Sequence, residues 1–326
     1  MSRVRSLMSL VALAVVSCGC DRTEKGSSTT TSAQQPATTS TTTATATTHA
    51  APTPAPAART PLFIFKNVGF STPESVLYDA AGDVYLVSNI EGRPDQADGK
   101  GFISRLSPEG KIETLKWIES GKNKVMLNAP KGMAVMDDTL YVADLDTVRM
   151  FDRKTGAPTG EVKIPGAAYL NDVTATPDGR ILVTDTGMKA GSTEAIYAID
   201  KSKKVTPVIK DNKELGQPNG LTAAGDKTWV VGQASGELYS IDAKGKKGDA
   251  KKLPKGSPDG IVALPDGEVL VSSWEARAIY RGKPDGELVE VIKDIKAPSD
   301  IGYDTKRQRL LVPLLDDNEV RVYEMK

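Results

Sequence analysis

Short apolar runs alternate with polar turns from residue 61 to the end of the chain, and one such pattern occurs six times. Each copy has a small turn, a polar residue, a few apolar residues, a second polar turn and a β-rich run. The turns read TPESV (72–76), APKGM (129–133), YLNDV (169–173), QPNGL (217–221), SPDGI (257–261) and APSDI (297–301). Their polar residues are 57, 40, 48, 40 and 40 residues apart, a spacing typical of four-stranded propeller blades.

The strands within each copy are short, β-branched and bounded by turn residues. The fifth copy shows them most clearly, as GIVALP, EVLVSSW, RAIYRG and ELVEVI. Asp-Gly pairs begin at positions 178, 266 and 285. Because Asp or Asn followed by Gly tolerates positive φ, these pairs predict tight hairpin turns. The pattern therefore predicts antiparallel four-stranded blades and no βαβ units.

The sixth copy contains only three strands after Ser299, namely DIGYD, RLLVPLL and EVRVYEM. We expect the segment LFIFK at 62–66 to supply the fourth strand from the other end of the domain. Such a closure removes exposed sheet edges, which otherwise invite aggregation. The sequence thus predicts an all-β, six-bladed β-propeller over residues 61–326, whose last blade is closed by the N-terminal strand of the domain.

The first sixty residues differ in character from the rest of the chain. Arg3 and Arg5 precede the apolar run LMSLVALAVV, and the run ends in VVSC. This segment resembles a bacterial lipoprotein signal peptide (1–18) whose lipobox makes Cys18 the lipidated residue. An ordinary secretory signal cut nearby is the alternative. In both cases the protein is exported, and lipidation at Cys18 would leave it anchored to a membrane, facing the periplasm or the cell surface.

Residues 19–60 consist largely of Thr, Ser, Ala and Pro, with almost no large apolar side chain. Nothing in this composition can offset the entropy lost on ordering, so we expect a disordered tether. A glycosylated stalk is the alternative. The chain therefore divides into a signal peptide, a tether and a propeller.

The composition excludes several kinds of catalytic site from the propeller. Both cysteines lie near the lipobox, and the only histidine, His49, lies in the tether. A Ser-His-Asp triad, a Cys-His dyad and a His-ligated zinc site are therefore excluded. The 42 basic and 42 acidic residues balance, so charge gives no reason to expect a nucleic-acid partner. We expect a monomer that contacts the membrane only through its N-terminal lipid.

The polar residue of each repeated turn is expected to face the central axis, because the first strand of a propeller blade lines the channel. The six residues in chain order are Glu74, Lys131, Asn171, Asn219, Asp259 and Ser299. Two carboxylates and two carboxamides around one axis are costly to desolvate unless a cation lies among them. Oxygen ligands of this kind suit Ca²⁺, with Mg²⁺ or another hard divalent cation as the alternative. Each residue taken alone is also an ordinary turn residue.

The ordered set of polar residues resembles the gluconolactonase and senescence marker protein family, which is akin to diisopropyl fluorophosphatase and the paraoxonases. The matching residues are Glu74 in PESV, Asn171 in NDVTATPDGRILVTDTGM, Asn219 in PNGL and Asp259 in SPDGI. The resemblance implies that these four residues bind a catalytic Ca²⁺ ion that polarises the carbonyl group of a lactone or ester. It also implies that Asp259 is a catalytic residue, either as general base or as nucleophile.

Lys131 is the main departure from the family pattern, since paraoxonase-like sequences can have a histidine at this position. We regard Lys131 as a second candidate catalytic residue, which could orient substrate, stabilise negative charge or act as a base. Alternatively, its ammonium group could replace the metal and leave an inactive propeller.

Substrate contacts are expected from the loops at 90–101 and 186–193, which join the second and third strands of their blades. Gln233, Trp274 and Glu275 occupy the matching points of the fourth and fifth blades. Trp274 could stack on a ring-shaped substrate, with surface packing as the alternative.

The leading hypothesis from the sequence is a calcium-dependent, lipid-anchored hydrolase of a lactone or related ester. The alternative is a non-catalytic propeller that binds a protein, peptide or glycan on its rim, because propellers perform both kinds of function. A condensing enzyme of the strictosidine synthase type fits less well, since no catalytic Glu or His pairing supports it.

Overall fold

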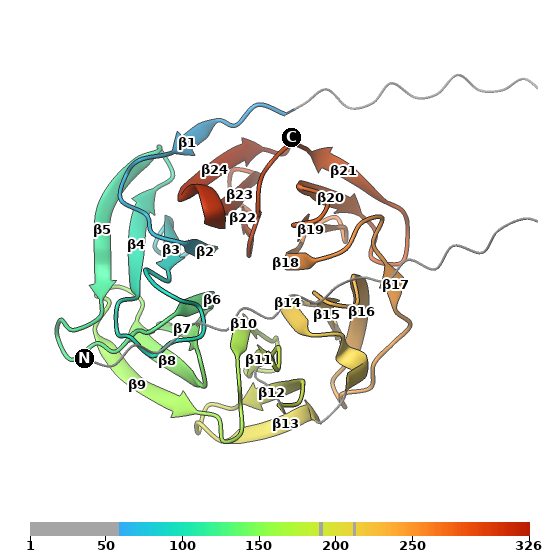
Figure 1. Ribbon diagram of the computed structural model, residues 1–326, viewed down its shortest axis with the longest axis horizontal. Coiled ribbons are helices and arrows are strands. Elements are labelled where there is room, and N and C mark those ends of the chain that lie inside the picture. Colours follow the sequence, from blue (N-terminus) through green and yellow to red (C-terminus); the bar gives the residue numbers. More distant parts are fainter. Residues whose placement is uncertain (1–58, 189–191, 211–212) are drawn as a thin grey trace, which may run out of the picture. The chain divides into compact units, whose positions relative to one another are not determined.

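The computed structural model describes residues 59–188, 192–210 and 213–326. Within this part of the chain the strands form six four-stranded antiparallel sheets arranged around a central axis (Figure 1). The predicted signal peptide, the lipidation site Cys18 and the tether up to residue 58 lie outside the described residues. None of the helices in the described ranges is long and apolar enough to cross a membrane.

The first three blades follow one another along the chain, and their innermost strands are β2, β6 and β10 (Figure 1). Blade 1 contains β2 (Pro73–Asp79), β3 (Val84–Asn89), β4 (Phe102–Ser107) and β5 (Lys111–Glu119). Blade 2 contains β6 (Pro130–Met136), β7 (Thr139–Asp144), β8 (Thr147–Asp152) and β9 (Pro158–Lys163). Blade 3 contains β10 (Leu170–Ala175), β11 (Ile181–Asp185), β12 (Ala195–Ile199) and β13 (Val205–Lys210).

The second half of the ring follows the same plan until the last blade. Blade 4 contains β14 (Pro218–Ala224), β15 (Lys227–Gly232), β16 (Glu237–Asp242) and β17 (Lys251–Lys252). Blade 5 contains β18 (Pro258–Ala263), β19 (Val269–Ser273), β20 (Ala278–Gly282) and β21 (Leu288–Ile292). Blade 6 contains β22 (Gly302–Asp304), β23 (Arg309–Leu314), β24 (Glu319–Glu324) and β1 (Phe63–Phe65). Two short 3₁₀ helices, η1 (Lys213–Leu215) and η2 (Leu315–Asp317), lie in connections between strands.

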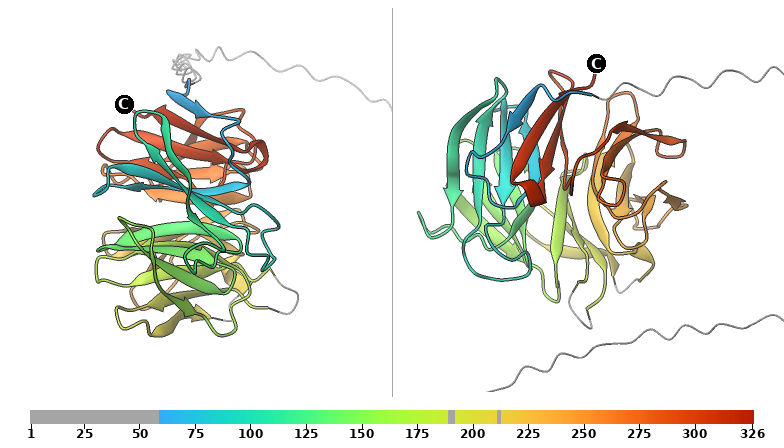
Figure 2. Two further views of the ribbon diagram at one scale, coloured as in Figure 1. Left: turned by 90° about the vertical axis from the view of Figure 1, so that its left-hand side faces the viewer. Right: turned by 45° about the horizontal axis from the view of Figure 1, so that its top comes forward.

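The ring is closed by strand β1, as the sequence predicts. Phe63 pairs with Val322 and Phe65 with Val320, so β1 becomes the outermost strand of blade 6. Figure 2 shows β1 (blue) beside β24 (red), although they come from opposite ends of the propeller sequence. The predicted fold class, blade number and closure are therefore confirmed.

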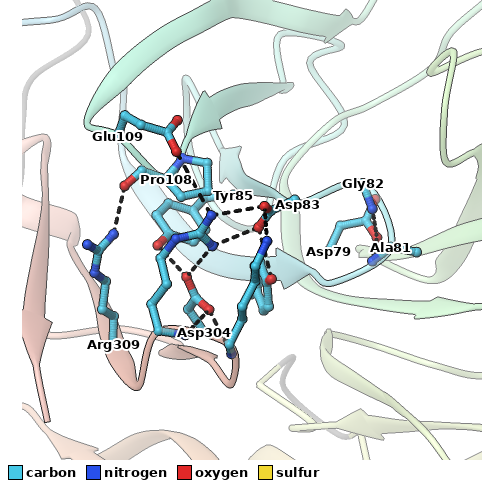
Figure 3. A network of polar contacts seen from close by, with 12 residues as sticks. Asp79, Ala81, Gly82, Asp83, Tyr85, Pro108, Glu109, Asp304 and Arg309 are labelled. Carbon is cyan, nitrogen blue, oxygen red and sulfur yellow. Dashed lines mark hydrogen bonds and ion pairs between the residues drawn. The ribbon is translucent and has the colours of Figure 1, made fainter. Parts of the chain in front are cut away.

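Polar contacts reinforce the junction between blades 1 and 6 (Figure 3). The guanidinium group of Arg307 donates two hydrogen bonds to Asp83, at 2.7 and 2.9 Å, and a third to Asp304 at 3.1 Å. The hydroxyl group of Tyr85 donates to Asp304 at 2.7 Å. Hydrogen bonds from Arg307 hold the pKa of Asp83 well below its usual range. Bidentate pairs of this kind fix geometry as well as adding stability.

All three predicted Asp-Gly pairs lie in hairpin turns, between β10 and β11, between β18 and β19, and between β20 and β21. Gly179 and Gly267 have φ values of +81° and +78°, the left-handed conformation that Gly adopts without steric cost. Gly286 does not have a positive φ, and its N–H donates to the carbonyl of Lys283 at 2.9 Å. This third pair still lies in the hairpin turn between β20 and β21, because a turn closed by an i to i+3 bond can form without positive φ.

Phe65 provides a test of the closure, since its side chain belongs with Val320 and Val322 to a core cluster shared by blades 1 and 6 and is only 4% exposed. We expect Phe65→Ala to reduce the free energy of unfolding by about 3 kcal/mol, through lost burial and the cavity left behind. Its neighbour Ile64 is 52% exposed on the same strand, so Ile64→Ala should change stability by less than about 0.5 kcal/mol. Urea unfolding monitored by circular dichroism measures both variants. Equal effects would show that β1 contributes through backbone pairing alone.

Candidate metal centre

The six polar residues of the repeated turns lie at or just before the starts of the innermost strands. We call Glu74, Lys131, Asn171, Asn219, Asp259 and Ser299 the axial ring. All six are buried, with exposed fractions between 0 and 6%. In blades 1 to 5 the pairing with the next strand shifts register at this point, for example between Pro73 and Ser75 and between Pro258 and Ile261. A β-bulge changes the direction of a side chain and bends its strand. The same irregularity in five blades therefore helps to set the direction of the ring side chains.

Close approach between innermost strands brings the ring residues near one another. A Cβ atom on Gly220 would lie 2.4 Å from the carbonyl oxygen of Asp259, and one on Gly260 would lie 2.6 Å from the Cα atom of Asp300. Neither position can accept a side chain without a shift of the neighbouring backbone. The glycines that follow Asn219 and Asp259 are thus required by the narrow centre of the ring.

Three of the four predicted metal ligands have a buried oxygen with no hydrogen-bond partner among the described residues. These atoms are Glu74 Oε2, Asn219 Oδ1 and Asp259 Oδ1. Buried polar atoms are nearly always hydrogen-bonded, and each exception calls for an explanation such as an ion. Two carboxylate oxygens and a carboxamide oxygen are ligands that a hard divalent cation prefers. The residues present therefore fit a metal of the predicted class.

The fourth predicted ligand, Asn171, is held by a side chain from the neighbouring strand. Its Nδ2 donates to Thr186 Oγ1 at 3.0 Å, and the same hydroxyl group donates to the carbonyl of Pro218 at 2.9 Å. Because Nδ2 is occupied in this way, Oδ1 is the acceptor that the carboxamide retains for a further ligand. Sequence reasoning did not identify Thr186, although it follows the conspicuous segment RILVTD.

Burial and mutual repulsion disfavour the ionised form of the ring carboxylates. Burial, followed by Asp259 and Asp300, raises the pKa of Glu74 well above its usual range. Burial and then Asp300 raise the pKa of Asp259 to about 8. No group of three or more His, Cys, Asp or Glu side chains suited to a metal occurs in the described part of the chain. The candidate centre consists instead of two carboxylates and two carboxamides, and a cation there would reverse these pKa shifts.

Two further buried carboxylates lie next to the axial ring. Asp172 accepts hydrogen bonds from the N–H groups of Leu221 and Val173, at 2.8 and 2.7 Å, and Asp300 accepts one from the hydroxyl group of Ser75. Burial raises the pKa of Asp300 to about 7. Both residues line a channel of about 250 Å³ to which all six blades contribute. Asp172 and Asp300 thus accept hydrogen bonds from protein donors, whereas the unpaired oxygens of Glu74, Asn219 and Asp259 do not.

Lys131 is fully buried but does not pair with the ring carboxylates. Its Nζ donates to the carbonyl of Ala129 at 3.2 Å and lies 4.2 Å from the ring centroid of Tyr169. No ion pair within the described ranges includes Lys131. Burial lowers its pKa to about 8, opposed mainly by Glu74. If the ammonium group took the place of the metal, it would donate hydrogen bonds to the unpaired oxygens of the axial ring. In the structure it donates to Ala129, and those oxygens have no partner among the described residues.

Acidic residues at the ends of second strands hold the segments that lead into the ring. Asp144 accepts hydrogen bonds from the N–H groups of Asn128 and Ala129, and Asp185 accepts them from Ala168 and Tyr169. These bonds fix the backbone just before Lys131 and Asn171. Sequence reasoning missed this function, yet the signal was present as an Asp at the same point of YVAD and LVTD.

The three predicted substrate-binding residues differ in their contacts. Trp274 is half-buried, and its indole group lies close enough to Asp259 to lower the pKa of that carboxyl, although Nε1 lacks a hydrogen bond of normal geometry. Gln233 is half-buried, and its N–H donates to the carbonyl of Gln217. Glu275 is exposed and accepts a hydrogen bond from Gly256 N–H at 2.8 Å. Of the three, Trp274 shows an interaction with a residue of the axial ring.

The two predicted substrate loops differ in what the structure describes. In the 90–101 loop, Asp95 is close enough to Lys131 and Tyr169 to influence both of their pKa values electrostatically. This loop therefore reaches the rim where the axial ring lies. Residues 189–191 of the other loop lie outside the described residues.

Comparison with solved structures finds proteins of similar fold but low sequence identity. A gluconolactonase from Xanthomonas campestris is 17% identical, with a TM-score of 0.62 over 80% of this chain and 89% of that chain. Virginiamycin B lyase from Staphylococcus aureus is 16% identical, with a TM-score of 0.59 over 81% of this chain and 98% of that chain. At such identities the similarity shows the fold alone.

A family comparison is more specific. No curated protein matches the sequence. Residues 72–306 match the model of the SMP-30/gluconolactonase/LRE-like region, and this range includes all six residues of the axial ring. The chain therefore belongs to the SMP-30/gluconolactonase/LRE-like family.

Proposed function

We propose that this protein is a hydrolase of lactones or related esters that depends on a divalent cation, for which Ca²⁺ is the expected ion. Glu74, Asn171, Asn219 and Asp259 would hold the cation. The observation that carries the proposal is the set of buried ring oxygens without a hydrogen-bond partner. A protein that used these residues only as turn residues would be expected to satisfy such atoms internally. Family membership supports the same class of reaction.

The chemistry assigned to the site divides between the cation and the chain. A bound divalent cation supplies Lewis-acid polarisation of the carbonyl group that is attacked. In this proposal Asp259 would accept a proton from the attacking water or attack the carbonyl itself. Trp274, beside Asp259, contributes an apolar wall and an indole N–H with no partner among the described residues.

The similarity to streptogramin-type lyases raises a second candidate reaction. A catalytically inactive form of virginiamycin B lyase has a histidine replaced by alanine. The only histidine of this chain, His49, precedes the propeller. A lyase reaction that needs a histidine therefore has no candidate residue in the ring, and hydrolysis remains the proposal. The alternative is a non-catalytic propeller that binds a ligand on its rim. The N-terminal sequence supports the further proposal that the propeller is exported and anchored through Cys18.

Removal of the metal tests the proposed function. We expect EDTA to abolish turnover of the responsive members of a panel of aldonolactones and aryl esters, and added Ca²⁺ to restore it. Calorimetry with Ca²⁺ and with Mg²⁺ identifies the preferred ion independently of turnover. Hydrolysis that persists in EDTA would contradict the metal-dependent mechanism. Ca²⁺ binding without turnover of any lactone or ester would favour the binding protein.

A further inference from the structure

The ammonium group of Lys131 lies in an unusual environment for a buried cation. The residue is 1% exposed, and the described protein atoms supply its Nζ with one acceptor, the carbonyl of Ala129 at 3.2 Å. A lysine ammonium has three donors, and lysine is almost never fully buried unless it is paired. The remaining favourable contact is the face of Tyr169 at 4.2 Å. Lys131 thus keeps donors available to a group that enters the site.

The acidic residues that face Lys131 each have another partner. Asp95 forms an ion pair with Arg93 at 3.0 Å, on the loop above the ring. Asp144 forms an ion pair with Arg149 at 3.0 Å and accepts the backbone bonds described above. Glu74, the third, belongs to the proposed set of metal ligands. None of the three is therefore a dedicated counter-ion for Lys131.

Tyr169 joins Lys131 to the candidate metal centre. Its ring is buried, and the electrostatic influence of Glu74 and Asp259 on its pKa places those carboxylates near it. The backbone of Tyr169 is fixed on both sides, since its N–H donates to Asp185 at 2.8 Å and its carbonyl accepts from Thr186 N–H at 2.9 Å. Tyr169 therefore acts as a rigid platform that holds the ammonium group beside the ring.

The unpaired ammonium group of Lys131 favours an anionic ligand. A buried charge without a counter-ion is costly, and an anion that enters beside Lys131 would remove that cost. A carboxylate or phosphate group also supplies the acceptors that Lys131 lacks, in charge-assisted hydrogen bonds.

We propose that Lys131, positioned by Tyr169, is an anion-binding subsite, so that the substrates are lactones or esters that carry a carboxylate or phosphate group. This inference rests on the proposed function, because the anion is recognised while the ester group lies at the metal centre. The substrate would therefore carry two features, namely the lactone or ester bond that is cleaved and a separate anionic group.

Direct binding tests the subsite without turnover. Methylphosphonate and acetate are titrated calorimetrically into the Ca²⁺-loaded wild type, Lys131→Met and the control Lys111→Met, an exposed lysine on β5. We expect Lys131→Met to weaken binding by about 10- to 100-fold, the range of a charged hydrogen bond, and Lys111→Met to leave it unchanged. Tyr169→Phe, which keeps the ring, should bind better than Tyr169→Leu. Should Lys131→Met fail to fold, Lys131→Gln is used in its place. Equal affinities for wild type and the Lys131 variant would overturn the proposal.

Turnover then separates recognition from chemistry. Glucono-1,5-lactone and its 6-phosphate share the same lactone and differ by one anionic phosphate group. We expect the ratio of their kcat/KM values to favour the phosphorylated lactone in wild type and to fall at least about tenfold in Lys131→Met. An equal loss for both substrates would make Lys131 a general base and contradict the subsite. If anions bind through Lys131 but no lactone or ester is cleaved, the proposed function fails and the subsite stands.

Discussion

Asp259→Asn is expected to abolish Ca²⁺ binding and hydrolysis together. The change keeps the shape of the side chain but removes one of the two negative charges in the axial ring, and the ring offers no third carboxylate to replace it. Affinity for Ca²⁺ depends on the number of charged ligands, so we expect it to fall at least about 100-fold. Turnover should fall at least about 1,000-fold, because the same residue is also the candidate base or nucleophile.

The measurement combines calorimetry with Ca²⁺ and initial rates on the best lactone. The matched control is Asp226→Asn, an exposed residue between β14 and β15, which should behave as wild type. Normal Ca²⁺ binding by Asp259→Asn would show that Asp259 is not a ligand. If turnover is lost while Ca²⁺ binding stays normal, Asp259 takes part in catalysis but is not a metal ligand.

The metal-free protein is expected to become less stable as pH rises from 5 to 8, and Ca²⁺ is expected to reverse this trend. Burial raises the pKa of Asp259 to about 8 and of Asp300 to about 7, and raises that of Glu74 as well, whereas unfolded carboxyl groups titrate near pH 4. Between these values the folded state binds more protons than the unfolded state. Its stability is therefore greatest below about pH 4 for these groups and is lost as pH rises through the folded pKa values.

Thermal unfolding in EDTA and in Ca²⁺, at pH 5 and pH 8, measures the effect. We expect Tm in EDTA to fall by about 5 °C or more over this interval, and the increase caused by Ca²⁺ to be larger at pH 8. The pKa of Lys131 is lowered to about 8, so its titration affects stability mainly above pH 8. Asp259→Asn should reduce the slope in EDTA, since asparagine does not titrate. A metal-free Tm that is constant or rises from pH 5 to 8 would contradict the assigned pKa shifts.

The blade number and the closure could be predicted because both depend on local patterns. Each turn and its strands recur at nearly constant spacing, and the missing strand of the sixth copy pointed to residues 62–66. The burial of all six ring residues follows from the same reasoning, since a polar residue at one register of every innermost strand must face the axis. Whether Glu74, Asn171, Asn219 and Asp259 bind a metal stays a prediction.

Contacts between blades could not be predicted from the sequence. Such contacts depend on side-chain directions, which are set by bulges and by packing between neighbouring strands. Examples are the bond from Asn171 to Thr186, the contact of Lys131 with the ring of Tyr169, and the backbone bonds to Asp185. Residue types alone did not indicate that the ammonium group of Lys131 donates to the carbonyl of Ala129.

The pairing of the first and last blades has a consequence for the order of events during folding. The N–H of Asp300 donates to the carbonyl of Glu74 at 3.0 Å, and Ser75 bonds to Asp300 across 225 residues of chain. Glu74 is therefore aligned only after almost the whole propeller has been synthesised and its ends have met. A nascent or truncated chain would expose Glu74 without its partners, so Ca²⁺ could not nucleate folding. If the proposed site is filled, capture of the ion would instead follow closure of the ring.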